Sequence, residues 1–112
     1  MADKNSLVVL WTSGDPDVAK KMVFMYTINA KKRGWWQDIK FIVWGPSSKL
    51  LSEDKELQEQ IKDFIEADIK VEACHADQYG VADDLAELGI EVKYMGEPLT
   101  DYLKSDSKVI TF

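Results

Sequence analysis

Short apolar runs and longer amphipathic stretches take turns along this chain, a pattern typical of strands connected by helices. The expected strands are Ser6–Trp11, Ile39–Trp44, Ile69–Cys74, Ile90–Tyr94 and Val109–Phe112. The expected helices are Pro16–Arg33, Glu53–Ala67, Val81–Leu88 and Leu99–Lys104, with a short helical turn around residues 49–51. This alternation predicts an α/β domain with parallel strands.

The first helix has the clearest start and stop signals. Asp15 is suited to cap its beginning, and Pro16 fits the first helical position. Gly34 fits the position just past its end. One face of this helix, which we expect to pack on the sheet, is marked by Val18, Met22, Met25, Tyr26 and Asn29.

The strands differ in where they carry charge. The first strand is apolar from Leu7 to Trp11, which suits a central strand covered on both faces. In the second, third and fourth strands charged residues alternate with apolar ones, at Lys40, Lys70, Glu72, Glu91 and Lys93. The alternation predicts that one sheet face is poorly covered there. It favours strand order 4-3-2-1-5 over 2-1-3-4-5, because right-handed crossovers then place three helices on one face and only the last on the other.

The third strand ends at the only cysteine of the chain, Cys74, and the only histidine, His75, follows it. Strand parity places Cys74 on the more open face together with Lys70 and Glu72. Ligands of parallel α/β sheets gather at the carboxyl ends of the strands, so we predict that Cys74 is placed for chemistry. The alternative is that Cys74 is a small buried hydrophobe. His75 is either a helper beside the thiol or an exposed loop histidine.

A pocket at the same edge is a further prediction. Trp11 ends the first strand and Trp44 the second, and each either walls this pocket or is a core or interface aromatic. In order 4-3-2-1-5 Trp44 lies next to the third strand and is the better candidate. The predicted pocket residues are Trp44, Gly45, His75, Asp77 and Trp11.

Composition narrows the function classes. The 112 residues are enough for one domain, and the net charge of −6 argues against non-specific binding to nucleic acid or to an anionic membrane surface. A single cysteine excludes an internal disulfide and fits the reducing cytoplasm. A structural zinc site needs four ligands, mostly Cys and His, and the chain offers two, so we expect no metal site within one chain; a metal shared between subunits stays an alternative that nothing in the sequence requires. No membrane span and no cofactor are expected either.

Several segments resemble the small DsrE-like proteins. These are Val71–Cys74, Tyr79–Val81, Leu85–Leu99 and Val109–Phe112, with the turns Thr12–Gly14 and Val43–Pro46. The resemblance spans nearly the whole chain, residues 1–112, as a single domain. It implies a three-layer α/β/α fold with a five-stranded parallel sheet of order 4-3-2-1-5, in agreement with the strand parity.

The resemblance also implies an activity. The DsrE-like family includes sulfur-relay subunits, in which a cysteine after the third strand accepts sulfur as a persulfide and passes it on; Cys74 matches that position. Such members often form homo- or hetero-oligomers. Some relatives carry a second cysteine nearby, but Asp77 stands three residues after Cys74 here, which excludes exchange between two cysteines of one chain.

Two functions are therefore expected as alternatives. The first is a cytoplasmic persulfide carrier, similar to a sulfurtransferase, that uses Cys74 and works with a protein sulfur donor or acceptor. The second is a non-catalytic module of the same fold that binds a small ligand or a protein and has a structural cysteine. Self-association through the poorly covered sheet face is expected in addition.

Overall fold

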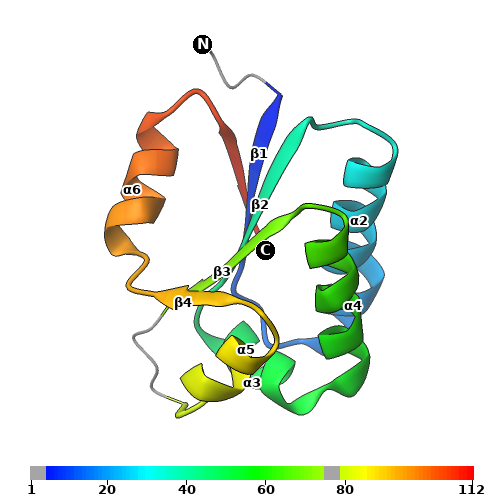
Figure 1. The fold of residues 1–112 in the computed structure, drawn as a ribbon, viewed down its shortest axis with the longest axis vertical. Coiled ribbons are helices and arrows are strands. Elements are labelled where there is room, and N and C mark those ends of the chain that lie inside the picture. The colour runs from blue at the N-terminus through cyan, green and yellow to red at the C-terminus, as the bar shows by residue number, and fades with distance from the viewer. Residues whose placement is uncertain (1–4, 75–78) are drawn as a thin grey trace.

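The computed structural model describes residues 5–74 and 79–112. Its centre is a five-stranded parallel sheet in the order β4-β3-β2-β1-β5 (Figure 1). The strands are β1 (Ser6–Trp11), β2 (Asp38–Val43), β3 (Lys70–Cys74), β4 (Glu91–Lys93) and β5 (Lys108–Thr111). Both the fold class and the strand order predicted from the sequence are confirmed.

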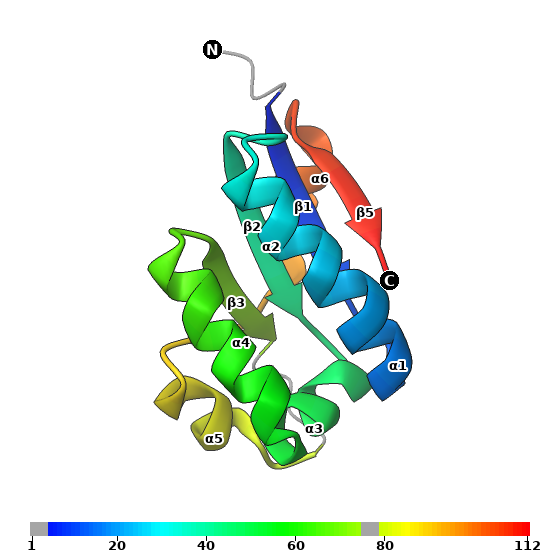
Figure 2. The ribbon, with the colours of Figure 1, turned by 90° about the vertical axis from the view of Figure 1, so that its right-hand side faces the viewer.

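The helices cover the two sheet faces unequally. They are α1 (Pro16–Val18), the π-helical η1 (Ala19–Val23), α2 (Phe24–Lys32), α3 (Pro46–Glu53), α4 (Lys55–Glu66), α5 (Ala82–Glu87) and α6 (Gly96–Lys104). Figures 1 and 2 show α2 and α4 side by side on one face and α6 on the other. This is the distribution that the strand order requires of right-handed crossovers.

The segments α1, η1 and α2 form one continuous helix. Asp15 caps its beginning, with its Oδ1 accepting a hydrogen bond from the Asp17 amide at 2.8 Å. Contrary to the expected helical face, Met22 and Met25 are 57% and 52% exposed. The buried residues are Ala19, Val23, Phe24, Thr27 and Ala30. Ala19, Val23, Thr27 and Ala30 recur at i, i+4, i+8 and i+11, so the period is helical as predicted but the buried face is the neighbouring one.

The larger core lies between the sheet and helices α1 to α5. At its centre the Phe24 ring lies 4.9 Å from Trp11, 5.3 Å from Phe41 and 5.0 Å from Phe64, measured between ring centroids. The contacts with Trp11 and Phe41 are edge-to-face and the contact with Phe64 is tilted, and aromatic pairs of this kind add to the stabilisation from burying the rings. Phe24 thus replaces the predicted methionines as the helix's main core residue.

A smaller core lies between the sheet and α6. Its buried residues are Val8, Ile42, Cys74 and Met95, and it is bordered by Leu10, Trp44, Leu99, Tyr102 and Val109. Cys74 is therefore on the α6 face of the sheet, as strand parity predicted. The expectation that this face is open is wrong at Glu72, whose side chain is fully buried, because α6 and neighbouring lysines cover it.

Candidate functional site

Cys74 is the last residue of β3, at the carboxyl edge of the sheet. It is 8% exposed and belongs to the smaller core. Its register partner in β4 is Lys93. His75 and Asp77 lie outside the described residues, so their predicted place beside the thiol stays a prediction.

An ion cluster surrounds Glu72, two residues before Cys74 on the same strand. Lys93 Nζ lies 2.6 Å from Glu72 Oε2, and Lys70 Nζ lies 3.7 Å from the same oxygen. The other oxygen, Oε1, accepts a hydrogen bond of 2.7 Å from the Tyr102 hydroxyl on α6. Lys93 also pairs with Glu91 at 3.1 Å. The buried carboxylate therefore has cationic or hydrogen-bonding neighbours at both oxygens, as burial of a charge requires.

The electrostatics of this cluster favour charged Glu72 and Lys93 and a neutral Tyr102. Burial alone disfavours the Glu72 carboxylate, but Lys93 and Tyr102 outweigh it and lower the pKa of Glu72. Burial and the hydrogen bond to Glu72 raise the pKa of the Tyr102 hydroxyl. The carboxylates of Glu72 and Glu91 raise the pKa of Lys93.

Of the two predicted pocket tryptophans, the structure brings only one to the side of Cys74. Trp44 is partly buried and borders the smaller core that contains Cys74. Trp11 is fully buried in the larger core on the opposite face, so it does not share a pocket wall with Cys74. Gly45, at φ +78°, adopts the left-handed conformation that glycine favours and precedes α3.

The carboxyl ends of β1 and β2 are tied together by Ser47, a residue that the sequence did not single out. Its hydroxyl donates to the Trp11 carbonyl at 2.6 Å and accepts from the Trp44 amide at 3.2 Å. Ser47 is fully buried. These hydrogen bonds fix the backbone of Trp44, which directly follows β2. Because β2 is the neighbour of β3 in the sheet, they also help to position the Trp44 side chain next to that strand.

Sequence reasoning also missed the role of Tyr102. The alternation of charges in β3 and β4 pointed to Glu72 and Lys93, but it was interpreted as a sign of an uncovered face. Tyr102 is thirty residues from Glu72 in the chain. No local pattern links Tyr102 to Glu72. The parity of β3 and the amphipathic character of α6 would, taken together, have placed both side chains between the sheet and α6.

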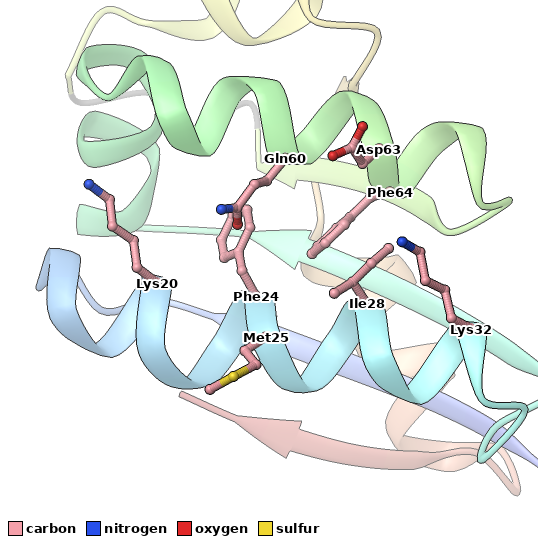
Figure 3. Close-up of a pocket in the computed structure, with 8 residues that line it drawn as sticks. All are labelled: Lys20, Phe24, Met25, Ile28, Lys32, Gln60, Asp63 and Phe64. Carbon is pink, nitrogen blue, oxygen red and sulfur yellow. The ribbon is translucent and has the colours of Figure 1, made fainter.

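A surface groove of about 360 Å³ lies between the first helix and α4, away from Cys74 (Figure 3). Its lining residues are Lys20, Phe24, Met25, Ile28, Lys32, Gln60, Asp63 and Phe64. It lies on the sheet face opposite α6, so it does not give access to Cys74. Within residues 5–74 and 79–112, no cluster of three or more His, Cys, Asp or Glu side chains is arranged to hold a metal ion.

Comparison with known proteins places this geometry in a family. A solved structure of the conserved protein of unknown function BT1422 from Bacteroides thetaiotaomicron is 40% identical in sequence, with a TM-score of 0.94. The alignment covers 100% of this chain and 98% of that one. The chain belongs to the same family as BT1422. The TM-score of 0.94 shows that the two chains share one fold over their whole length.

A more distant structure supports the fold alone. The crystal structure of the ychN protein from E. coli, which has a DsrE-like fold, aligns with a TM-score of 0.64 at 13% identity, over 100% of both chains. The fold of this chain is thus DsrE-like. No protein-family model and no curated protein matches the chain. None of the helices in the described part of the chain is both long and apolar enough to span a membrane.

Proposed function

We propose that the protein carries sulfur as a persulfide on Cys74 and passes it to a partner protein. The observation that carries this proposal is the position of Cys74, the only cysteine, as the last residue of β3 in a DsrE-like sheet. The sulfur-relay members that the sequence resembles have their acceptor cysteine after the same strand. The proposal needs neither a metal nor an organic cofactor.

The reaction is an exchange between sulfur atoms. The Cys74 thiolate attacks the outer sulfur of a donor persulfide, R–S–SH. An S–S bond forms at Cys74 Sγ, the S–S bond of the donor breaks, and the donor leaves as the thiolate R–S⁻ with the proton remaining on the transferred sulfur. A thiolate of the acceptor protein then attacks that outer sulfur and regenerates Cys74. No external oxidant or reductant is consumed in either step.

A second candidate function rests on the burial of Cys74. At 8% exposure, among the buried side chains of Val8, Ile42 and Met95, the thiol has the surroundings of a structural cysteine. In that case the protein is a module that binds a small ligand or a partner protein, with Trp44 and Gly45 at the strand-end pocket. The two functions differ in whether Cys74 reacts.

Intact mass spectrometry separates them. The reduced protein is incubated with a polysulfide or a small-molecule persulfide, and the persulfide carrier is expected to gain the mass of one sulfur atom. The adduct is expected to disappear on treatment with a reductant and to be absent in Cys74→Ala. A thiol that reacts with iodoacetamide but forms no sulfur adduct would contradict the carrier function and leave the binding module.

We propose in addition that copies of the chain associate and that the protein works in the cytoplasm. Self-association is supported by the exposed side chains around β4, where Tyr94 is 72% exposed and Lys70 and Glu91 are exposed as well. The single cysteine supports a reducing compartment.

A further inference from the structure

Helix α6 and the residue before it cover the sheet face on which Cys74 lies. Met95, which directly precedes α6, is fully buried in the smaller core together with Cys74. Leu99 and Tyr102, one and two turns into the helix region, pack against the same core. Figure 1 shows α6 alone on this face of the sheet. Access to Cys74 from this face therefore depends on the position of α6.

The apolar contact between α6 and the sheet is small. No residue within α6 is buried, and Leu103 is 60% exposed. By comparison, α4 on the other face has Leu57, Ile61 and Phe64 buried. Segments with few buried apolar contacts open locally at a lower free energy than the whole domain unfolds. Helix α6 is thus suited to open without unfolding the larger core.

A polar contact compensates for this weak apolar anchoring. The Tyr102 hydroxyl donates a hydrogen bond of 2.7 Å to Glu72 Oε1, and the Lys40 ammonium lies 5.5 Å from the centre of the Tyr102 ring. On the sheet side, Glu72 is itself fixed by Lys93 and Lys70. The hydrogen bond therefore joins α6 to a carboxylate that is fully buried and held in place by the neighbouring strand.

We propose that Tyr102 and Glu72 are positioning residues that hold α6 over Cys74 and so limit access to its thiol. This inference deepens the proposed function, on which it rests for its biological meaning. It reconciles a sulfur-accepting cysteine with its burial: a partner that displaces α6 exposes the thiol, and the closed state protects the thiol from unselective oxidation.

The variant that tests this is Tyr102→Phe, because phenylalanine keeps the ring over Lys40 and removes only the hydroxyl. Opening of α6 then no longer breaks a hydrogen bond to a charged group, and in the closed state Glu72 Oε1 loses its donor. Labelling of Cys74 by iodoacetamide, measured by intact mass in native buffer, is expected to be slow in the parent protein and about tenfold faster in Tyr102→Phe.

The matched control is Tyr26→Phe. It also removes one partly buried tyrosine hydroxyl, which accepts a hydrogen bond of 3.0 Å from Trp36 Nε1, but it does so in contact with the larger core. Its labelling rate is expected to stay within about twofold of the parent rate, because Tyr26 lies on the opposite sheet face and the bond between Tyr102 and Glu72 is left intact.

A series of low urea concentrations separates opening of α6 from unfolding of the domain. Opening of α6 exposes little surface, so the labelling rate is expected to depend on urea more weakly than the unfolding equilibrium followed by circular dichroism. Equal urea dependence would overturn the proposal, since Cys74 would then react only from the unfolded chain. An unchanged rate in Tyr102→Phe, or labelling of the parent at the rate of a free cysteine, would overturn it as well.

The outcome is independent of sulfur transfer. If Tyr102→Phe accelerates alkylation but the parent and the variant accept no sulfur, α6 covers Cys74 as proposed and the carrier function is wrong. If sulfur is accepted at equal rates by both proteins, the carrier function holds and the covering role of Tyr102 is wrong.

Discussion

Glu72 and Cys74 lie two residues apart on β3, face the same side of the sheet, and are both buried beneath the α6 layer. One is a charged residue whose burial requires partners, and the other is the residue with the most distinctive chemistry in the chain. The partners of Glu72, namely Lys93, Lys70 and Tyr102, also define the immediate polar surroundings of the site. The stability of this cluster is therefore tied to the state in which Cys74 is covered.

Glu72→Gln is expected to change how stability depends on acid pH. The pKa of Glu72 is lowered in the folded protein from its ordinary value of 4.5, so its contribution is complete above about pH 4.5 and is lost as the pH falls through the lower folded value. The variant should therefore be less stable than the parent at neutral pH, and the difference should shrink as the pH falls below 4.5. Urea unfolding at a series of pH values measures this.

Some acid sensitivity is expected to remain in Glu72→Gln. The pKa of Asp38 is lowered by Lys40, and that of Asp54 is lowered because Lys20 and the Leu57 amide outweigh its burial. Both contributions are lost at acid pH in parent and variant alike. A constant difference between the two proteins over the whole acid range would contradict a charged Glu72 in the folded state.

Tyr102→Phe is expected to flatten the loss of stability at alkaline pH. Burial and Glu72 raise the pKa of Tyr102 above its ordinary value of 10.0 in the folded protein. Above about pH 10 the unfolded chain therefore ionises this tyrosine while the folded chain does not, so stability that is complete below this pH falls as the pH rises. The variant lacks this contribution. An identical alkaline decline in both proteins, followed by urea unfolding, would argue against the buried hydroxyl.

Replacement of Cys74 tests its burial without reference to sulfur chemistry. Cys74→Ala leaves a small space in the smaller core and is expected to lower the unfolding free energy by about 1 kcal/mol. Cys74→Ser places a hydroxyl among Val8, Ile42 and Met95 and is expected to cost more, about 1–3 kcal/mol. If serine is tolerated better than alanine in urea unfolding, the side chain faces water, and the core assignment of Cys74 fails.

Ser47→Ala is expected to destabilise the edge of the sheet that carries the site. The change removes the donor to the Trp11 carbonyl and the acceptor for the Trp44 amide in a fully buried place. The Trp44 amide also donates directly to the Trp11 carbonyl at 3.2 Å, so neither group is left without a partner. Loss of the two serine hydrogen bonds is therefore expected to lower the unfolding free energy by about 1–3 kcal/mol in total. The matched control, Ser52→Ala, removes an exposed hydrogen bond to the Lys49 carbonyl and should change the unfolding free energy by less than about 0.5 kcal/mol.

The strand order could be predicted because its cause is local. Charges alternate with apolar residues along β2 and β3, as at Lys40 and Glu72, which indicates that the two sheet faces have different surroundings. Only some strand orders place the helices unequally on the two faces. The start of the first helix was predictable for the same reason, since Asp15 caps amides within the next three residues. Features that depend on residues close together in the chain could thus be predicted from the sequence.

The remaining features depend on contacts that no local pattern encodes. The face of the first helix was wrong because two neighbouring faces both carry apolar residues, and the structure buries the one with Val23 and Phe24 while Met22 and Met25 stay exposed. The burial of Glu72 was missed because its hydrogen bond comes from Tyr102, on a helix that folds back over the sheet. A charged strand residue indicates either solvent or a polar partner, and sequence alone does not choose between them.

Self-association is expected through the exposed surface around β4, which is an edge strand of the sheet. Tyr94 provides exposed apolar area there, while Glu91 and Lys93 place both signs of charge on one short strand. In a two-fold contact the same patch meets itself, so Glu91 of each copy can face Lys93 of the other. Sedimentation velocity over a range of concentrations is expected to show a species larger than the monomer.

The two matched variants for this experiment are Tyr94→Glu and Met22→Glu. Each replaces an exposed apolar side chain by a carboxylate, the first beside β4 and the second on η1, in the helix layer on the opposite face of the sheet. Tyr94→Glu is expected to shift the equilibrium towards monomer by about tenfold or more, and Met22→Glu to leave it unchanged. A monomer at every concentration, or dissociation by Met22→Glu alone, would exclude the β4 surface as the contact between copies of the chain. The charges of this strand would then serve only to hold Glu72 in place.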